Sequence, residues 1–117
     1  MFGYSWGYPI FLYSQPADMR KSINGLCSLV TNHLGKDPLR DGAFVFVNRN
    51  RDRMKILLWD RHGYWLLTKR LEAGRFQMPP SDSQIPPEGI SLSNEQLMMI
   101  IEGIDLGSVK RMRRYKS

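Results

Sequence analysis

The side chains best suited to chemistry in this 117-residue chain are basic, and most of them gather in two stretches. Residues 43–75 carry eight arginines and lysines against three acidic residues, and residues 106–117 carry five against none. Such segregated positive charge, on a chain of net charge +6, favours a polyanionic partner, of which nucleic acid is the commonest. The candidate DNA contacts are Arg49, Arg51, Arg53, Lys55, Arg61, Lys69, Arg70 and Arg75, together with Lys110, Arg111, Arg113 and Arg114 in the tail.

Two simpler explanations of this charge stay open. Residues 76–105 carry five acidic side chains and no basic one, so this segment can fold back and neutralise the basic stretch. The basic tail at 106–117 is equally compatible with a solvated segment that contacts nothing.

Catalytic groups are sparse by comparison. The two histidines and the single Cys27 lack the short spacing of metal ligands, and Cys27 falls among apolar residues at helical spacing, as a buried small side chain does. The sequence has neither a phosphate-binding glycine loop nor a nucleophile elbow. Asp18, Asp52 and Asp60 could together hold a metal ion, yet each falls at a turn or a helix cap. We therefore predict no enzyme activity, cofactor or metal, with a small metal-dependent nuclease as a minor alternative.

The basic stretch has the pattern of three antiparallel strands within residues 43–71. Runs rich in apolar and aromatic residues are separated by polar turns at 48–52 and 60–63. The first run is apolar throughout, which predicts a central strand that is covered on both faces.

The pairing register follows if both turns are symmetric. Val45 then lies opposite Ile56, and Arg53 lies opposite Arg70. Like charges in directly opposite positions are destabilising, and an anion bound between the two arginines would remove that penalty. Long arginine stems that splay into water would also relieve the repulsion, and this is the simpler explanation.

Side chains alternate along a strand, so the meander has two distinct faces. Met54, Ile56 and Leu58 share one face, which we predict to be core packed against the helix over residues 18–34. The other face carries aromatic side chains, and Phe44, Trp59 and Tyr64 are predicted there as exposed contacts for a protein partner.

That first helix is predicted from apolar residues that recur at helical spacing over about 18–34. Asp18 is the expected N-cap and Gly35 the expected C′ residue.

A second and shorter helix is predicted over about 93–102. Ser93 followed by Gln96 forms a capping box at its start, and Gly103 is the expected stop. The proline-rich residues 77–90 are predicted to be an extended linker without regular structure.

These elements predict an α+β fold in which an antiparallel sheet of three to four strands carries one helix on a face and a short C-terminal helix. The fourth strand candidate is 10–13. Residues 1–9 form an irregular aromatic arm, residues 10–105 a single α+β domain, and residues 106–117 a basic tail.

The compartment is predicted from what the sequence lacks. A single cysteine suits a reducing environment, and no apolar run reaches the length of a transmembrane helix. The first basic residue is Arg20, which comes too late for the charged start of a signal peptide. We expect a cytoplasmic protein with no membrane partner.

Four blocks of the sequence, in this order, resemble the accessory proteins of insertion-sequence-66 family transposons, which are also called TnpB or Orf2-like proteins. The blocks are residues 16–26, 44–57, 59–63 and 69–76, and residues 97–106 also fit. The resemblance implies a role in transposition beside a separate, larger transposase that carries the catalytic carboxylates. It assigns no catalytic residue to this chain.

Taken together, the residues and the resemblance predict a non-enzymatic accessory factor for DNA transposition that binds DNA through its basic meander and tail. The first alternative is a protein–protein adaptor that binds the element-encoded transposase and does not contact DNA. The second is the metal-dependent nuclease.

Overall fold

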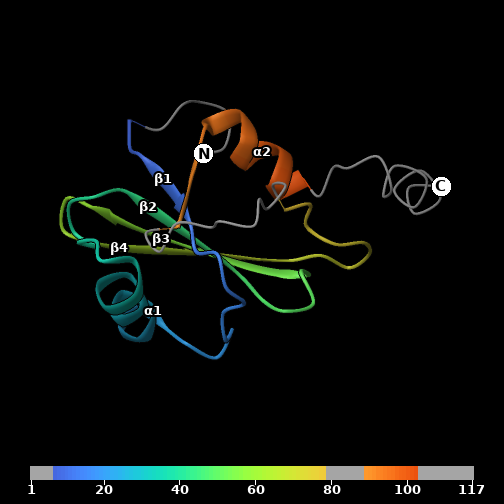
Figure 1. Ribbon diagram of the computed structural model, residues 1–117, viewed down its shortest axis with the longest axis horizontal. Coiled ribbons are helices and arrows are strands. Elements are labelled where there is room, and N and C mark those ends of the chain that lie inside the picture. Colours follow the sequence, from blue (N-terminus) through green and yellow to red (C-terminus); the bar gives the residue numbers. More distant parts are fainter. Residues whose placement is uncertain (1–6, 79–88, 103–117) are drawn as a thin grey trace.

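The computed structural model describes residues 7–78 and 89–102, and within them a five-stranded sheet lies between two helical layers (Figure 1). The first helical layer lies below the sheet in this view and the second lies above it. In chain order the elements are β1 (Ile10–Leu12), α1 (Ile23–Leu29), the π-helical turn η1 (Val30–Leu34), β2 (Ala43–Val47), β3 (Arg53–Asp60), β4 (Gly63–Arg70), β5 (Ile90–Leu92) and α2 (Asn94–Glu102).

The sheet order is β4-β3-β2-β1-β5, and the meander has the predicted register. Val45 lies opposite Ile56, and Arg53 lies opposite Arg70. The α+β class is therefore confirmed, with β2 as the central strand and all five of its residues buried.

The outer part of the sheet differs from the prediction of an entirely antiparallel sheet. β1 pairs with β2 in parallel, because the chain crosses through α1 before it enters β2, as parallel neighbours require. A fifth strand, β5, pairs antiparallel with β1. The predicted linker over 77–90 is therefore wrong at Ile90, where β5 begins, while 79–88 lie outside the described residues.

Two hydrophobic cores lie on the two faces of the sheet. Met54, Ile56 and Leu58 are core residues as predicted, but they pack with Leu97 and Ile100 of α2. The prediction that the first helix covers this face is wrong. Side-chain alternation fixes which residues share a face, and it is silent on which helix covers that face. The opposite face packs against α1 and η1, through Phe44, Phe46, Leu57, Leu26, Val30 and Leu34.

The first helix begins at Ile23, five residues later than predicted, with Ser22 rather than Asp18 at the N-cap. The Asp18 carboxylate instead accepts hydrogen bonds from the backbone N–H and the guanidinium of Arg20. The end of the helical segment is as predicted, since Gly35 adopts the left-handed conformation (φ 65°) just after η1.

Gly42 is required where the chain enters β2. Its φ of 149° is disfavoured for other residues, and a Cβ atom there would run into the carbonyl oxygen of Pro9. The N–H of Ala43 donates to that same carbonyl at 2.9 Å. This close approach brings the segment before β1 alongside β2.

The start of α2 has the predicted capping box. The N–H of Ser93 donates to Gln96 Oε1 at 2.8 Å, and the N–H of Gln96 donates to Ser93 Oγ at 3.1 Å. Leu92 and Leu97 on either side of this cap are both buried. The helix ends at Glu102, and the expected stop, Gly103, lies outside the described residues.

Candidate nucleic-acid interface

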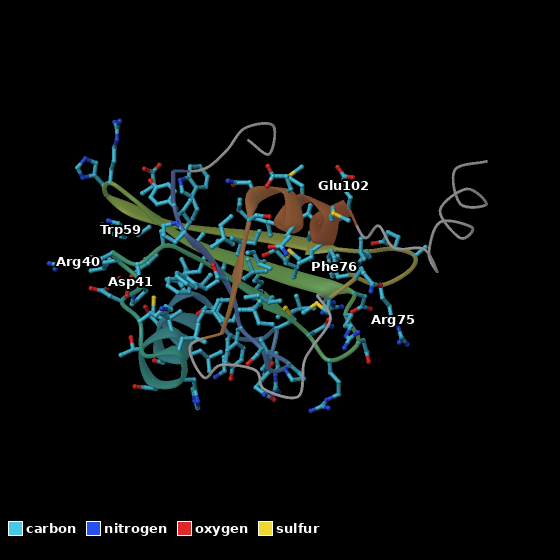
Figure 2. The ribbon with its side chains drawn as sticks, turned by 45° about the horizontal axis from the view of Figure 1, so that its top comes forward. Arg40, Asp41, Trp59, Arg75, Phe76 and Glu102 are labelled. Atoms are coloured by element: carbon cyan, nitrogen blue, oxygen red, sulfur yellow. The ribbon has the colours of Figure 1, made fainter. Side chains whose placement is uncertain are left out.

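Five exposed arginines gather where the β2–β3 turn meets the end of β4. The turn comprises residues 48–52 and projects at the edge of the molecule, beside the segment that follows β4 (Figure 1). The arginine end, as we call it, consists of Arg49, Arg51, Arg53, Arg70 and Arg75. Figure 2 shows Arg75 at the opposite end of the molecule from Arg40 and Trp59.

The β2–β3 turn is held in one conformation by the side chain of Asn48. Its Oδ1 accepts from the N–H groups of Asp52 and Arg53, each at 3.0 Å, and its Nδ2 donates to Asp52 Oδ1 at 2.7 Å. Arg51 has a φ of 59°, which is uncommon for a residue with a side chain. The amide of Asn48 therefore supports a backbone conformation that the turn would not otherwise favour.

The segment after β4 forms hydrogen bonds with the backbone of the same turn. The N–H of Leu71 donates to the Asp52 carbonyl at 2.8 Å, and the N–H of Phe76 donates to the Arg51 carbonyl at 2.6 Å. Phe76 is 1% exposed and anchors this segment in the α2-side core. The sequence reasoning missed Phe76, whose only signal is that it is the first large aromatic residue after Gly74. Its burial places Arg75 next to the turn.

Most of these arginines form no ion pair in the described part of the chain. Arg70 Nε pairs with Glu72 Oε2 at 2.9 Å, but both side chains are more than half exposed, so the pair contributes little. The side chains of Arg49, Arg51, Arg53 and Arg75 make no ion pair with any residue in 7–78 or 89–102. The predicted repulsive pair, Arg53 opposite Arg70, is present.

The two lysines of the meander donate hydrogen bonds to backbone carbonyls of the protein itself. Lys55 Nζ donates to the carbonyls of Met19 and Lys21 at 2.7 and 2.8 Å, which ties the segment before α1 to the sheet. Lys69 Nζ donates to the carbonyl of Ile101 at 2.7 Å and ties the end of α2 to the opposite face. We therefore leave Lys55 and Lys69 out of the proposed DNA contacts.

The remaining predicted contacts lie elsewhere. Arg61 is exposed in the β3–β4 turn, at the far end of the hairpin, with a φ of 59°. The tail residues Lys110, Arg111, Arg113 and Arg114 lie outside the described residues.

The far end of the hairpin carries aromatic side chains, and we call Trp59, Tyr64 and Trp65 the aromatic end. Trp59 and Tyr64 are half-buried and pack edge to face with ring centroids 5.0 Å apart. Phe44 is fully buried, so its prediction as an exposed partner contact is wrong. Trp65 lies directly opposite the core residue Leu58, yet it is 49% exposed. The nine residues of α2 span about 14 Å, so this helix covers only part of the eight-residue hairpin strands.

Tyr64 is chemically distinct within the aromatic end. Burial, with a smaller contribution from the neighbouring Cys27, raises the pKa of the Tyr64 hydroxyl to about 12. Cys27 packs against the α1-side core, but it is half-buried rather than buried as predicted.

The three aspartates of the nuclease alternative are not brought together. Asp52 and Asp60 lie at opposite ends of β3, about 25 Å apart along the strand. The Asp18 carboxylate is occupied by Arg20, whose hydrogen bonds lower its pKa to about 2. Within residues 7–78 and 89–102, no three His, Cys, Asp or Glu side chains are grouped so that they could hold a metal ion. The same residues contain no helix of the length and apolarity that crossing a membrane requires.

Comparison with known proteins places this chain in a family. The family model described as IS66 Orf2 like protein matches residues 8–111. The chain belongs to the IS66 Orf2-like family. This match confirms the predicted resemblance and associates the chain with an accessory role in transposition.

Two relatives from Sinorhizobium fredii (strain NBRC 101917 / NGR234) are similar over most of their length. The uncharacterized protein y4jC is 37% identical over 111 residues, which cover 95% of this chain and 92% of the relative. The uncharacterized protein y4hO is 32% identical over 96 residues, covering 82% and 80% respectively. No solved structure matches this chain.

Proposed function

We propose that this protein is a transposition accessory factor without catalytic activity of its own, which binds DNA through its arginine end. The observation that carries the proposal is the group of four exposed arginines, Arg49, Arg51, Arg53 and Arg75, that have no acidic partner among the described residues. A cytoplasmic location, with direct access to the element's DNA, is part of the same proposal.

The charge arrangement suits the phosphates of a nucleic-acid backbone. A phosphate bound between Arg53 and Arg70 would turn a repulsive cross-strand pair into two attractive contacts. Guanidinium groups bind phosphate oxygens bidentately, and each contact releases condensed counterions from the DNA. Affinity is therefore expected to fall steeply as the salt concentration rises.

A titration of duplex DNA at several salt concentrations tests the proposal. The double variant Arg53→Ala/Arg70→Ala should bind more weakly to every sequence and lower the slope of log affinity against log salt by about one to two units. The matched control is Arg40→Ala/Arg61→Ala, which also removes two positive charges, because Arg40 is 86% exposed and lies at the other end of the molecule (Figure 2), and Arg61 is exposed at the far end of the hairpin. A control that weakens binding as much as the double variant would show that net charge, rather than the arginine end, is responsible.

The absence of catalysis is tested with labelled duplex and single-stranded DNA in Mg²⁺ or Mn²⁺. We expect the DNA to remain intact. Cleavage that Asp52→Ala abolishes would favour the nuclease instead.

The exposure of Trp65 favours a second candidate function, an adaptor for the element's transposase. An exposed tryptophan beside two half-buried aromatic rings is the kind of anchor that dominates interface energies. If the adaptor is correct, Trp65→Ala should abolish co-purification with the transposase, while the Arg53→Ala/Arg70→Ala variant should slow association without abolishing it. Protein that co-purifies with the transposase and binds no DNA at low salt would establish the adaptor and exclude the proposed function.

A further inference from the structure

We propose, resting on the DNA-binding function above, that the β2–β3 turn enters the major groove of duplex DNA and reads base edges with Arg49, Asn50 and Arg51. These three residues form the exposed tip of the turn. Arg53, Arg70 and Arg75 then hold phosphates on either side of the groove. The inference separates the residues that select a sequence from those that supply affinity.

The rigidity of the turn is the first observation behind this assignment. The Asn48 side chain accepts two hydrogen bonds and donates one within the loop, and the N–H groups of Leu71 and Phe76 donate to the carbonyls of Asp52 and Arg51 from outside it. A fixed backbone places side chains on base edges with little loss of conformational freedom on binding. Nonspecific phosphate binding has no need of such a constraint, because phosphates lie all along the duplex.

Strain at the tip is the second observation. Arg51 occupies the left-handed region at φ 59°, where glycine or asparagine would fit at lower cost. Such strain persists only because the surrounding hydrogen bonds over-determine the backbone. Arg61 in the β3–β4 turn has the same φ, so what sets Arg51 apart is the group of hydrogen bonds that holds its backbone within an exposed, basic tip.

The chemistry of the tip is the third observation. Arginine donates two parallel hydrogen bonds to O6 and N7 of guanine, and asparagine pairs with N6 and N7 of adenine. Both patterns are displayed in the major groove, which is wide enough to admit a two-stranded β-ribbon. Lys55 and Lys69 do not compete for this role, because each holds carbonyls of the protein itself.

The positions of Arg53, Arg70 and Arg75 are the fourth observation, because they suit contacts to phosphates rather than to bases. Arg53 and Arg70 lie opposite each other on β3 and β4, behind the tip, and Phe76 fixes Arg75 beside the turn. A turn inserted into a groove brings such flanking side chains to the phosphates that border it. Phosphate contacts position the protein, and base contacts at the tip give it sequence preference.

The experiment selects bound duplexes from a random-sequence library with the full-length protein and with arginine-to-lysine variants. Lysine keeps the charge and the phosphate attraction but loses the bidentate geometry that recognises guanine. The tip variant is Arg49→Lys/Arg51→Lys, and the matched control with the same number of replacements is Arg53→Lys/Arg70→Lys. Each is then titrated with the selected duplex and with a scrambled duplex of the same composition.

We expect the wild-type protein to enrich a guanine-containing sequence and to prefer it over the scrambled duplex. The tip variant should lose about tenfold or more of this preference while its salt dependence stays unchanged. The control variant should keep the preference. This combination would support the assignment.

Two results would overturn the inference and leave the proposed function standing. One is DNA binding by the wild-type protein that enriches no sequence at all. The other is a preference that survives in the tip variant. If the wild-type protein binds no duplex at low salt, both the inference and the proposed function are wrong, so the two failures are distinguishable.

Discussion

At one end of the β3–β4 hairpin Arg53 lies opposite Arg70 in water, whereas at the other end Trp59 packs edge to face against Tyr64. The arginine end is fixed by the hydrogen bonds of the Asn48 side chain and by those that Leu71 and Phe76 donate to the turn, which leave Arg49, Arg51, Arg53 and Arg75 without an ion pair among the described residues. The aromatic end is fixed by packing and closed by a turn of two residues. One hairpin can thus present a charged surface and an apolar surface whose separation is set by the length of its strands.

Lysine and arginine have different roles within the same basic stretch. Lys55 and Lys69 lie on opposite faces of neighbouring strands, and each holds a helical layer to the sheet through backbone carbonyls. A flexible ammonium can reach into a partly buried site and saturate several acceptors. The planar guanidinium groups stay at the surface, where bidentate recognition of an external anion is possible.

The largest expected effect comes from Ile56→Asp, which should unfold the hairpin and with it both the arginine end and the aromatic end. Ile56 is 2% exposed in the α2-side core, midway along the hairpin. A buried carboxylate without a partner there should lower the free energy of unfolding by about 4 kcal/mol or more. Urea unfolding followed by circular dichroism measures this loss. A variant that stays as stable as wild type would contradict the burial of this face.

An intermediate effect is expected from Lys55→Met, which keeps the stem of Lys55 and removes its ammonium group. The carbonyls of Met19 and Lys21 would then lose their partner, at a cost of about 2 kcal/mol in the free energy of unfolding. Arg53→Met, two residues away, is the control and should change stability by less than about 0.5 kcal/mol.

Equal losses in Lys55→Met and Arg53→Met would remove the distinction between internal lysines and external arginines. The same pair of variants is informative in a DNA titration. There the order should reverse, with Arg53→Met weakening binding more than Lys55→Met does.

The smallest effect concerns pH at the aromatic end. The pKa of Tyr64 is raised to about 12 in the folded protein, above the ordinary value of 10.0, so folding favours the protonated hydroxyl. The resulting stability is complete below pH 10 and is lost as the pH rises from about 10 towards 12. Tyr64→Phe should show a shallower loss over that interval, measured by the urea midpoint. Identical pH profiles would mean that Tyr64 is solvated in the folded protein.

The sequence predicted the meander, its register and the central position of β2, because alternation and turn residues are local signals. It failed where the outcome depends on distant segments. The start of the first helix moved to Ile23, since Lys55, more than thirty residues away, holds the carbonyls of Met19 and Lys21 outside the helix. The three residues of β5 were missed because so short a strand, next to prolines, carries almost no pattern.

The candidate site was predictable in composition and not in arrangement. The basic stretch contained the right arginines, but the charge pattern does not show that Lys55 and Lys69 bind carbonyls of segments that are distant in the sequence. Phe44 is buried rather than exposed as predicted, because the coverage of each face depends on the placement of two helices.

The most direct test of the central claim is a backbone amide NMR titration of the full-length protein with duplex DNA. Binding through the arginine end predicts that amide signals of residues 48–53 and 70–76 shift with DNA, while those of 59–65 stay in place. Loss of these shifts in the Arg53→Ala/Arg70→Ala variant would tie them to the two guanidinium groups. Shifts confined to residues 59–65, or binding that leaves 48–53 and 70–76 unchanged, would contradict the account.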